Sequence, residues 1–264
     1  MSVNTTPLLE VKDLTVSFLT PHGMVEAVSG SNFSISPGER VGVVGESGSG
    51  KSLTGLSLLR LTPKAAQVGG QILLDGQDLL NLSQKEMQRI RGRDVSMVFQ
   101  EPMTALDPVF TVGQQISATF RAHHQVSKKE AKDRAIALLA EVGIPEPERR
   151  YKEFPHRLSG GMRQRAMIAM ALVCEPRLLV ADEPTTALDV TIQAQVLDLI
   201  VELSERRGTA VLLITHDLGV VAETCERVLT MYAGQIVEES PVEAALESPR
   251  HPYTSGLLGA IPRA

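Results

Sequence analysis

The fold is decided by eight consecutive residues, Gly45-Glu46-Ser47-Gly48-Ser49-Gly50-Lys51-Ser52. They match the phosphate-binding loop pattern G-x-x-x-x-G-K-[ST] at every defined position. A short apolar run, Val41-Gly42-Val43-Val44, precedes them and is typical of a strand buried on both faces. Residues 52–61 predict a helix that Thr62-Pro63 stops. A strand, a glycine-rich loop and a helix in this order predict a nucleotide phosphate site in an α/β fold.

The residue types of the loop suit phosphate chemistry. Glycines let successive backbone N–H groups curl around phosphate oxygens, and the helix N-terminus adds a partial positive charge. We expect Lys51 to reach the β- and γ-phosphates and the Ser52 hydroxyl to bind Mg²⁺. Glycine and serine are also common in ordinary loops, but the full match between a strand and a helix favours the phosphate site. The expected nucleotide-binding residues are Gly45, Glu46, Ser47, Gly48, Ser49, Gly50, Lys51, Ser52 and Leu53.

A second stretch, Leu178-Leu179-Val180-Ala181-Asp182-Glu183, supplies carboxylates. Its apolar part predicts a central strand, and ligands bind at the carboxyl ends of such strands. Asp182 is suited to hold Mg²⁺ through a water, and Glu183 to act as general base or to orient the attacking water. Adjacent strand residues point to opposite faces, so the two acids can differ in role only if the strand ends there, as Pro184 indicates. Two acids after a strand could also form a solvated loop; their pairing with a phosphate loop favours catalysis.

The remaining pattern predicts how the chain is organised. Residues 8–36 alternate as half-buried strands do, with a turn at Pro21-His22-Gly23. Residues 101–173 are mainly helical, and Ser127-Lys128-Lys129-Glu130 forms a capping box before a helix that Gly143 ends. Strand 210–215 follows an amphipathic helix that ends before Gly208.

The C-terminal part predicts a hairpin and a helix. Residues 228–238 should form the hairpin, turning at Ala233-Gly234. A second capping box is expected at Ser240-Pro241-Val242-Glu243.

Composition excludes several classes of protein. The chain has 264 residues, is 43% hydrophobic and 22% charged, and carries a net charge of -5, which argues against nucleic-acid binding. No apolar run approaches the roughly 20 residues of a transmembrane helix, and the first residues lack the features of a signal peptide. Cys174 and Cys225 form no metal-binding pattern and are expected to be reduced core residues. These features predict a cytosolic protein.

A third stretch resembles one family closely. Leu158-Ser159-Gly160-Gly161-Met162 is similar to the signature motif of ATP-binding-cassette (ABC) proteins, and it lies between the phosphate loop and the acidic strand, as in that family. The resemblance implies that Ser159, Gly160 and Gly161 bind the γ-phosphate held by the other subunit of a dimer. A serine and two glycines at a helix start form an anion-binding surface. The alternative is an ordinary helix cap.

Four further residues take roles from the same resemblance. Gln100 resembles the glutamine that senses Mg²⁺ and the nucleophilic water. The stretch Ala187-Leu188-Asp189 resembles the loop that crosses the dimer interface, which gives Asp189 a place at that interface. His216 resembles the switch histidine that contacts the γ-phosphate, although a histidine at a strand end is often structural. Phe18 stands where the family places an aromatic ring against adenine, and it could equally be a core residue.

The resemblance covers almost the whole chain and implies an architecture. It implies a cassette over residues 8–259, with a tail over 240–264. Its P-loop NTPase (RecA-like) core, about 8–100 and 174–240, would have a largely parallel sheet and an N-terminal antiparallel β subdomain. A helical subdomain, about 101–173, would be inserted into it. Two such subunits would sandwich two ATP molecules with Mg²⁺, held here by Ser52, Gln100 and Asp182, and move the coupling helices of membrane subunits.

Three stretches resemble the dipeptide and oligopeptide importer branch: residues 100–108, residues 182–191 and His251-Pro252-Tyr253-Thr254. Peptide import is therefore expected, with nickel-chelate or opine import as the alternative. Many motors of this branch carry a Cys-rich segment with an iron–sulfur cluster, whereas this chain has no such cysteines, so we predict no cluster in it.

The branch also implies partners. These are a second, related ATPase in a heterodimer, two transmembrane permease subunits and an extracytoplasmic substrate-binding protein. The chain would lie peripherally at the cytoplasmic face of the bacterial inner membrane.

Three alternative functions carry less weight. A translation or DNA-repair ATPase usually has two fused cassettes or a long coiled coil. A non-catalytic subunit conflicts with the intact Lys51, Asp182, Glu183 and His216, and an exporter conflicts with the branch features.

Overall fold

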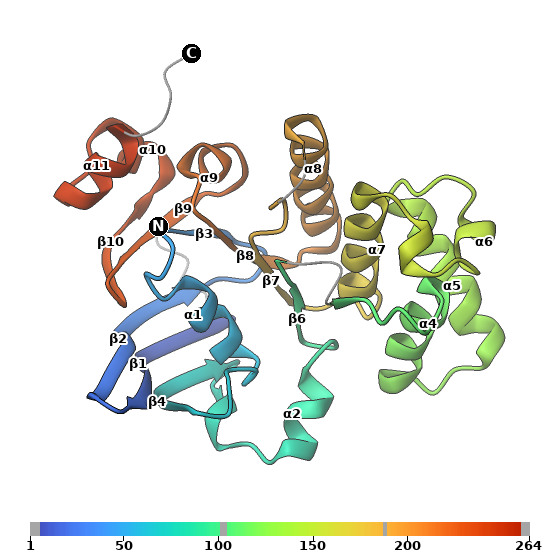
Figure 1. Cartoon of the computed structure of the whole chain (residues 1–264), viewed down its shortest axis with the longest axis horizontal. Coiled ribbons are helices and arrows are strands. Elements are labelled where there is room, and N and C mark those ends of the chain that lie inside the picture. Colours follow the sequence, from blue (N-terminus) through green and yellow to red (C-terminus); the bar gives the residue numbers. More distant parts are fainter. Residues whose placement is uncertain (1–5, 101–104, 187–188, 260–264) are drawn as a thin grey trace. The chain divides into compact units, whose positions relative to one another are not determined.

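The computed structural model describes residues 6–100, 105–186 and 189–259. The chain forms two compact units, Met1–Met87 with Ala210–Ala264, and Gln88–Thr209 (Figure 1). We call them unit 1 and unit 2. The boundaries of unit 2 differ from those expected for the helical subdomain, near residues 101 and 173. The reason is that unit 2 contains strands and a long helix in addition to the shorter helices. The residue bounds expected for the core and the helical subdomain stay a prediction.

Unit 1 contains an antiparallel sheet with the strand order β2-β1-β4-β5. Its strands are β1 (Leu9–Thr20), β2 (Gly23–Ile35), β4 (Ala66–Leu74) and β5 (Gln77–Asp78). Strands β1 and β2 pair as a long hairpin around the expected turn, with Thr20 opposite Gly23. The alternating pattern of residues 8–36 therefore predicted these two strands correctly, because one face of each strand is buried.

The second sheet of unit 1 has the strand order β10-β9-β3-β8. Its strands are β3 (Arg40–Val44), β8 (Ala210–Thr215), β9 (Arg227–Tyr232) and β10 (Gln235–Pro241). Strand β3 lies between β8 and β9 and runs parallel to both, so the phosphate loop leaves the middle of this sheet. All six residues of β8 are buried, which explains its unbroken apolar sequence. The helices are α1 (Lys51–Leu58), α9 (Leu218–Thr224), α10 (Val242–Glu247) and α11 (Pro252–Gly259).

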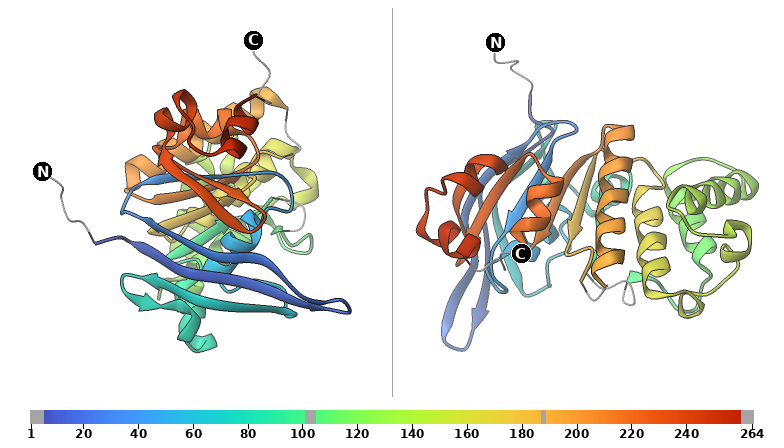
Figure 2. Two further views of the ribbon diagram at one scale, coloured as in Figure 1. Left: turned by 90° about the vertical axis from the view of Figure 1, so that its left-hand side faces the viewer. Right: turned by 90° about the horizontal axis from the view of Figure 1, so that it is seen from above.

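Unit 2 contains the parallel strands β6 (Val95–Val98) and β7 (Leu178–Asp182). Its helices include α4 (Val112–His123), α5 (Lys128–Glu141), α6 (Pro147–Arg150), α7 (Gly160–Leu172) and α8 (Val190–Arg207). Helices α4, α5 and α7 contact one another as a bundle, as Figure 2 shows. The expectation of a mainly helical stretch is confirmed for residues 105–173, and residues 101–104 lie outside the described ones. Helix α2 (Gln84–Ile90) spans the division between the units, and short 3-10 turns cover Leu79–Asn81 and Pro155–Arg157.

Helix ends show where local rules hold. The Ser127 side chain and Glu130 satisfy each other's backbone donors in a capping box, and Gly143 follows α5 with φ 73°, as predicted. Helix α1 ends three residues earlier than expected. Arg60 takes the left-handed conformation, and the N–H of Leu61 donates to the carbonyl oxygen of Leu56 at 2.9 Å. This hydrogen-bonded end, and not Thr62-Pro63, stops the helix.

The second expected capping box is wrong. Ser240 lies inside β10, opposite Val228 of β9, and its side chain makes no cap. The N-cap of α10 is Pro241, which has no side-chain hydrogen bond to offer. Pairing within the sheet buries Ser240, and that long-range constraint overrides the local capping pattern.

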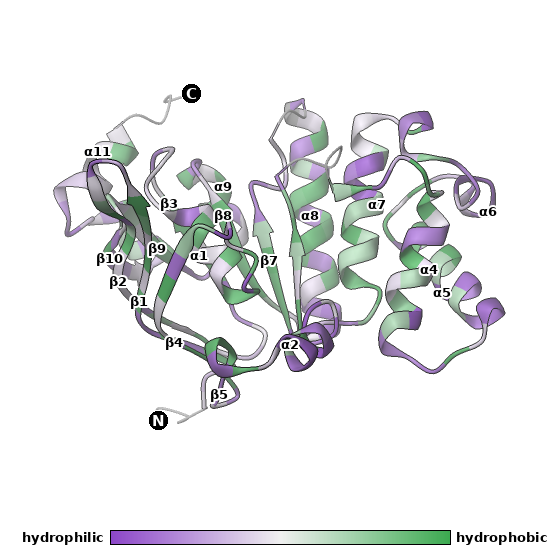
Figure 3. Ribbon diagram, turned by 60° about the horizontal axis from the view of Figure 1, so that its bottom comes forward, coloured by the Kyte–Doolittle hydropathy of each residue, from purple (hydrophilic) through white to green (hydrophobic). Residues whose placement is uncertain are grey.

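Apolar segments occupy the expected places. Figure 3 shows β7 and β8 as hydrophobic strands, and every residue of both is buried. Burial raises the pKa of Cys174 to about 11 and that of Cys225 to about 12, so both thiols are protonated at neutral pH, as expected of core residues. Among the described residues, no helix combines the length and the apolar character that crossing a bilayer requires.

Candidate nucleotide site

The phosphate loop takes its shape from glycines with positive φ. Gly45, Gly48 and Gly50 have φ of 156°, 81° and 104°. A Cβ at Gly45 would collide with the Met231 carbonyl oxygen, and one at Gly50 would lie 2.6 Å from that of Ala27. A Cβ at Gly48 would meet nothing within 4 Å. The two outer glycines therefore allow the loop to pack, whereas Gly48 stands at its open side.

The turn of the β9–β10 hairpin supports the loop. Ala233 and Gly234 both have positive φ, as a tight two-residue hairpin turn requires, and this confirms the expected turn. The N–H of Gly234 donates to the carbonyl oxygen of Ser49 at 2.9 Å. The carbonyl oxygen of Gly234 in turn accepts from the N–H of Ser29 at 2.8 Å. A residue 185 positions later in the chain thus fixes the loop, and no local sequence pattern reveals that contact.

Lys51 is buried within the loop, with 5% of its surface exposed. Its Nζ donates to the carbonyl oxygens of Gly45 at 2.7 Å and Glu46 at 2.8 Å. A buried ammonium needs such partners. The ammonium consequently lies across the loop, where a phosphate-binding lysine is required.

Three further features of the loop fit an anionic ligand. Gly50, the N-cap of α1, gives no side-chain cap, and the first turn carries no acidic residue, so the positive end of the helix is not neutralised by its own sequence. The buried Oγ of Ser49 has no hydrogen-bond partner in the described part of the chain. The open side at Gly48 leaves room for a phosphate. The residues present therefore fit the phosphates of a nucleotide.

In unit 2, strand β7 ends at Asp182, as predicted. Asp182 is buried, and the next residue, Glu183, has φ 43°. A left-handed backbone at a non-glycine residue is uncommon and costs free energy. It breaks the alternation of the strand, so Glu183 need not point opposite to Asp182. The structure thus supplies the geometric condition on which separate roles for the two acids depend.

Two side chains donate hydrogen bonds to Glu183. Its Oε2 accepts from Gln100 Nε2 at 3.0 Å and from Thr186 Oγ1 at 2.8 Å. Gln100 stands 83 residues earlier in the sequence, two residues after the end of β6. The structure therefore brings together two of the residues expected to be catalytic.

The loop that follows Glu183 is anchored by two glutamines. Gln164 of α7 is buried and donates from Nε2 to the carbonyl oxygen of Pro184. Gln193 of α8 donates to the carbonyl oxygen of Thr185 at 3.2 Å. The sequence indicated no role for either side chain. Each glutamine is a polar residue on the side of its helix that packs against the protein. That side can be recognised only when the packing is known.

The signature stretch lies at the start of α7. Ser159 is its N-cap, with Oγ accepting from the N–H of Met162 at 3.3 Å. Ser159 is exposed, and the first turn of α7 contains no acidic residue. The serine is thus an ordinary helix cap, and its helix end also carries the partial positive charge that an anion needs. Binding of a γ-phosphate in trans by Ser159, Gly160 and Gly161 stays a prediction.

The other expected residues lie at element ends or in a strand. Asp189 is the N-cap of α8, and Ala187 and Leu188 lie outside the described residues. His216 is exposed directly after β8. Phe18 is half-buried in β1, opposite Val25 and Ala66. Their roles at the dimer interface, at the γ-phosphate and at adenine stay predictions.

A glycine-rich loop between a buried strand and a helix, together with a strand that ends in two carboxylates, defines a P-loop ATPase. The model of the ABC transporter family matches residues 28–186, and the chain belongs to this family. The chain is 55% identical to "Probable peptide ABC transporter ATP-binding protein y4tR" of Sinorhizobium fredii, over 97% of this chain and 77% of that protein. It is 53% identical to "Oligopeptide transport ATP-binding protein OppD" of Bacillus subtilis, over 98% and 73%.

Solved structures agree with this assignment. The ATP-binding cassette MJ0796, in a dimeric post-hydrolysis state bound to ADP and Pi, superposes with a TM-score of 0.79 at 28% identity, over 89% of this chain and 98% of that one. The cassette cbiO1 from Clostridium perfringens gives a TM-score of 0.77 at 27% identity, over 92% of each chain. The expected P-loop core with an antiparallel β part and inserted helices is confirmed, and the chain is an ABC transporter ATPase.

Proposed function

We propose that this chain hydrolyses ATP to energise the import of dipeptides or oligopeptides across the bacterial cytoplasmic membrane. The observation that carries the cargo assignment is its identity of 55% and 53%, over almost its whole length, to ATP-binding proteins named for peptide transport. The nickel-chelate and opine alternatives gain no support from these relatives. The net charge of -5 argues against a nucleic-acid-binding function.

The phosphate loop and the residues around Glu183 have distinct tasks. The loop N–H groups and Lys51 bind the phosphates, and Lys51 exchanges its bonds to the Gly45 and Glu46 carbonyls for bonds to phosphate oxygens. Ser52, Gln100 and Asp182 are the residues that would hold Mg²⁺. ATP would supply the phosphoryl group, and Mg²⁺ would neutralise charge on the phosphate oxygens.

Glu183 accepts the proton of the attacking water or orients that water. The hydrogen bonds from Gln100 and Thr186 to Glu183 Oε2 hold its carboxylate in one orientation. A base held in this way needs no rearrangement before the reaction. Gln100 therefore has a second task beside Mg²⁺, since it positions the general base.

The proposal includes partners. Ser159, Gly160 and Gly161 of a second, related ATPase would complete the site in a heterodimer. Two transmembrane permease subunits and an extracytoplasmic substrate-binding protein would complete the transporter, with this chain peripheral at the cytoplasmic face of the membrane. Two observations support a dimer: the exposed start of α7, whose first turn carries no acidic residue, and the dimeric state of the cassette MJ0796.

Substitution of Lys51 tests the proposal. In the transporter reconstituted in vesicles, Lys51→Ala should lower ATP-driven uptake of a labelled peptide by about a hundredfold or more, because a preorganised charge on the transferred phosphoryl group is lost. Lys64→Ala, at an exposed lysine of the same unit, is the matched control and should leave uptake unchanged. Peptide uptake untouched by Lys51→Ala would contradict the ATPase role. ATP-driven uptake of a nickel chelate in place of peptide would contradict the cargo.

A further inference from the structure

The stretch His251-Pro252-Tyr253-Thr254 marks a family branch in the sequence, and the mechanism above gives it no task. In the structure, α11 begins at Pro252 and brings Tyr253 to the phosphate loop. The Tyr253 hydroxyl accepts a hydrogen bond of 2.8 Å from the backbone N–H of Glu46, 207 residues earlier in the chain. Glu46 is the second residue of the loop.

That contact fixes a part of the loop that burial does not hold. Glu46, Ser47 and Gly48 are all exposed. The Glu46 carbonyl oxygen accepts from Lys51 Nζ at 2.8 Å, and its N–H donates to Tyr253. The two polar groups of this one residue therefore link the phosphate-binding lysine to the C-terminal helix.

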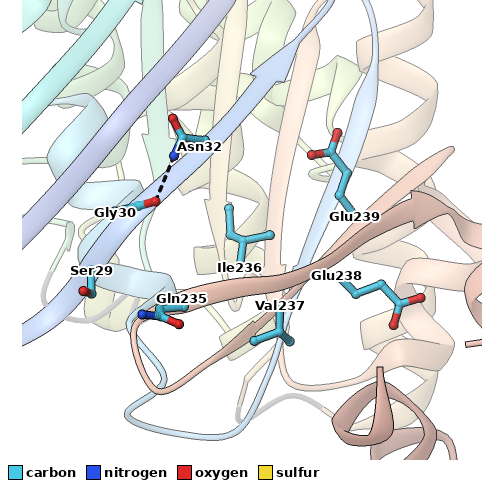
Figure 4. Close-up of a pocket in the computed structure, with 8 residues that line it drawn as sticks. All are labelled: Ser29, Gly30, Asn32, Gln235, Ile236, Val237, Glu238 and Glu239. Carbon is cyan, nitrogen blue, oxygen red and sulfur yellow. Dashed lines mark hydrogen bonds between the residues drawn. The ribbon is translucent and has the colours of Figure 1, made fainter. Parts of the chain in front are cut away.

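Tyr253 is itself held firmly. Its ring centroid lies 4.5 Å from that of Tyr232, at the end of β9. Before α11, the carboxylate of Glu238 accepts from the N–H groups of Arg250 at 2.9 Å and His251 at 3.0 Å. Glu238 belongs to β10 and is one of the residues that line a polar pocket of about 350 Å³, which none of the loop residues lines (Figure 4). The sheet thus anchors the start of α11, and the tyrosine side chain has a defined position.

We infer that Tyr253 is a positioning residue for nucleotide binding, which fixes the exposed first turn of the phosphate loop through Glu46. The segment from Arg250 to α11 acts as a C-terminal clasp on the loop. Its effect passes through the backbone of Glu46, so Tyr253 itself does not touch the nucleotide. The inference rests on the proposed function, in that ATP binds at this loop.

The test is Tyr253→Phe in the full chain, which removes the hydroxyl and keeps the ring. Loss of one hydrogen bond should weaken ATP binding about threefold to tenfold. In the assembled transporter, KM for ATP should rise by a similar factor while kcat stays within about twofold. The amide of Glu46 should exchange its hydrogen faster, and the melting temperature should change little. Tyr232→Phe is the matched control: it removes the hydroxyl of the neighbouring ring, which is tilted by 47° against that of Tyr253, and should leave ATP binding unchanged.

The outcomes separate the clasp from the proposed function. If Tyr253→Phe binds ATP as tightly as wild type and Glu46 exchange is unchanged, while Lys51→Ala loses binding, the clasp is wrong and the ATPase role stands. If neither substitution changes ATP binding, both proposals fail. If Tyr253→Phe does not fold, Glu238→Gln replaces it, because this change loosens the anchor of α11 without altering the loop; unchanged affinity in that variant would also overturn the clasp.

Discussion

The phosphate loop and the carboxyl end of β7 are built in different ways. Main-chain features make the loop: glycines with positive φ, carbonyl oxygens around a buried lysine, and a supporting hairpin turn. Side-chain hydrogen bonds from Gln100 and Thr186 make the end of β7. The first construction depends on the backbone, which substitutions strain, whereas the second depends on side chains, which substitutions can change without straining the backbone. We therefore expect substitutions in the loop to affect stability and binding, and substitutions at Glu183 to affect turnover alone.

The largest expected effect comes from Glu183→Gln. Removing the general base should lower ATP turnover in the assembled transporter by about 10²- to 10⁴-fold. ATP affinity should stay within a few-fold of wild type, because the loop is unchanged. Glu202→Gln is the matched control, since Glu202 forms an exposed ion pair with Arg206 in the same unit, and such pairs contribute little. Loss of ATP binding in Glu183→Gln would show that the two regions are not separable.

The next effect compares two glycines of the loop. Gly50→Ala combines a strained φ of 104° with a Cβ 2.6 Å from the Ala27 carbonyl oxygen, and should lower the free energy of unfolding by about 3 kcal/mol. Gly48→Ala has a comparable φ of 81° but open space, and should cost about 1 kcal/mol. Urea denaturation of both variants measures the difference. Equal losses of unfolding free energy in the two variants would mean that backbone strain alone, and not packing of Gly50 against β2, determines the effect.

The smallest effect concerns the anchor of α11 and depends on pH. Burial acts to raise the pKa of Glu238, but its interactions with the Arg250 N–H, the Thr254 side chain and His251 together outweigh burial, and the pKa lies below its usual value. The carboxylate therefore stabilises the fold above the unfolded-state pKa, about 4.5, and this contribution is lost as the pH falls through the lower folded-state value.

Glu238→Gln should consequently cost on the order of 1 kcal/mol at neutral pH and almost nothing in acid. Thermal unfolding of the variant and of wild type, followed from about pH 7 down to about pH 3, measures the difference. The two curves should converge on acidification. A constant gap across this range would show that the carboxylate charge does not hold the start of α11.

Local patterns predicted elements well where the forces are local. The capping box at Ser127 formed because its partner is three residues away. The same pattern at Ser240 failed because β10 pairs with β9 and buries that serine in the sheet. Helix α1 ended early because the chain can close a left-handed cap at Arg60 before it reaches Pro63. Pairing between strands decided the Ser240 case, whereas α1 ends in a local cap that the pattern of residues 52–63 did not indicate.

The phosphate loop, the acidic end of β7 and the family membership could be read from the amino-acid sequence alone, because each rests on short contiguous motifs whose chemistry follows from residue types. The groups that hold these motifs became known only from the packing of the chain: the side chains of Gln100 on Glu183, Gln164 on Pro184 and Tyr253 on the loop, and the backbone N–H of Gly234 on the loop. These partners lie between 20 and 207 residues apart from the groups they contact. Chain packing selects such contacts, and no local periodicity reports them.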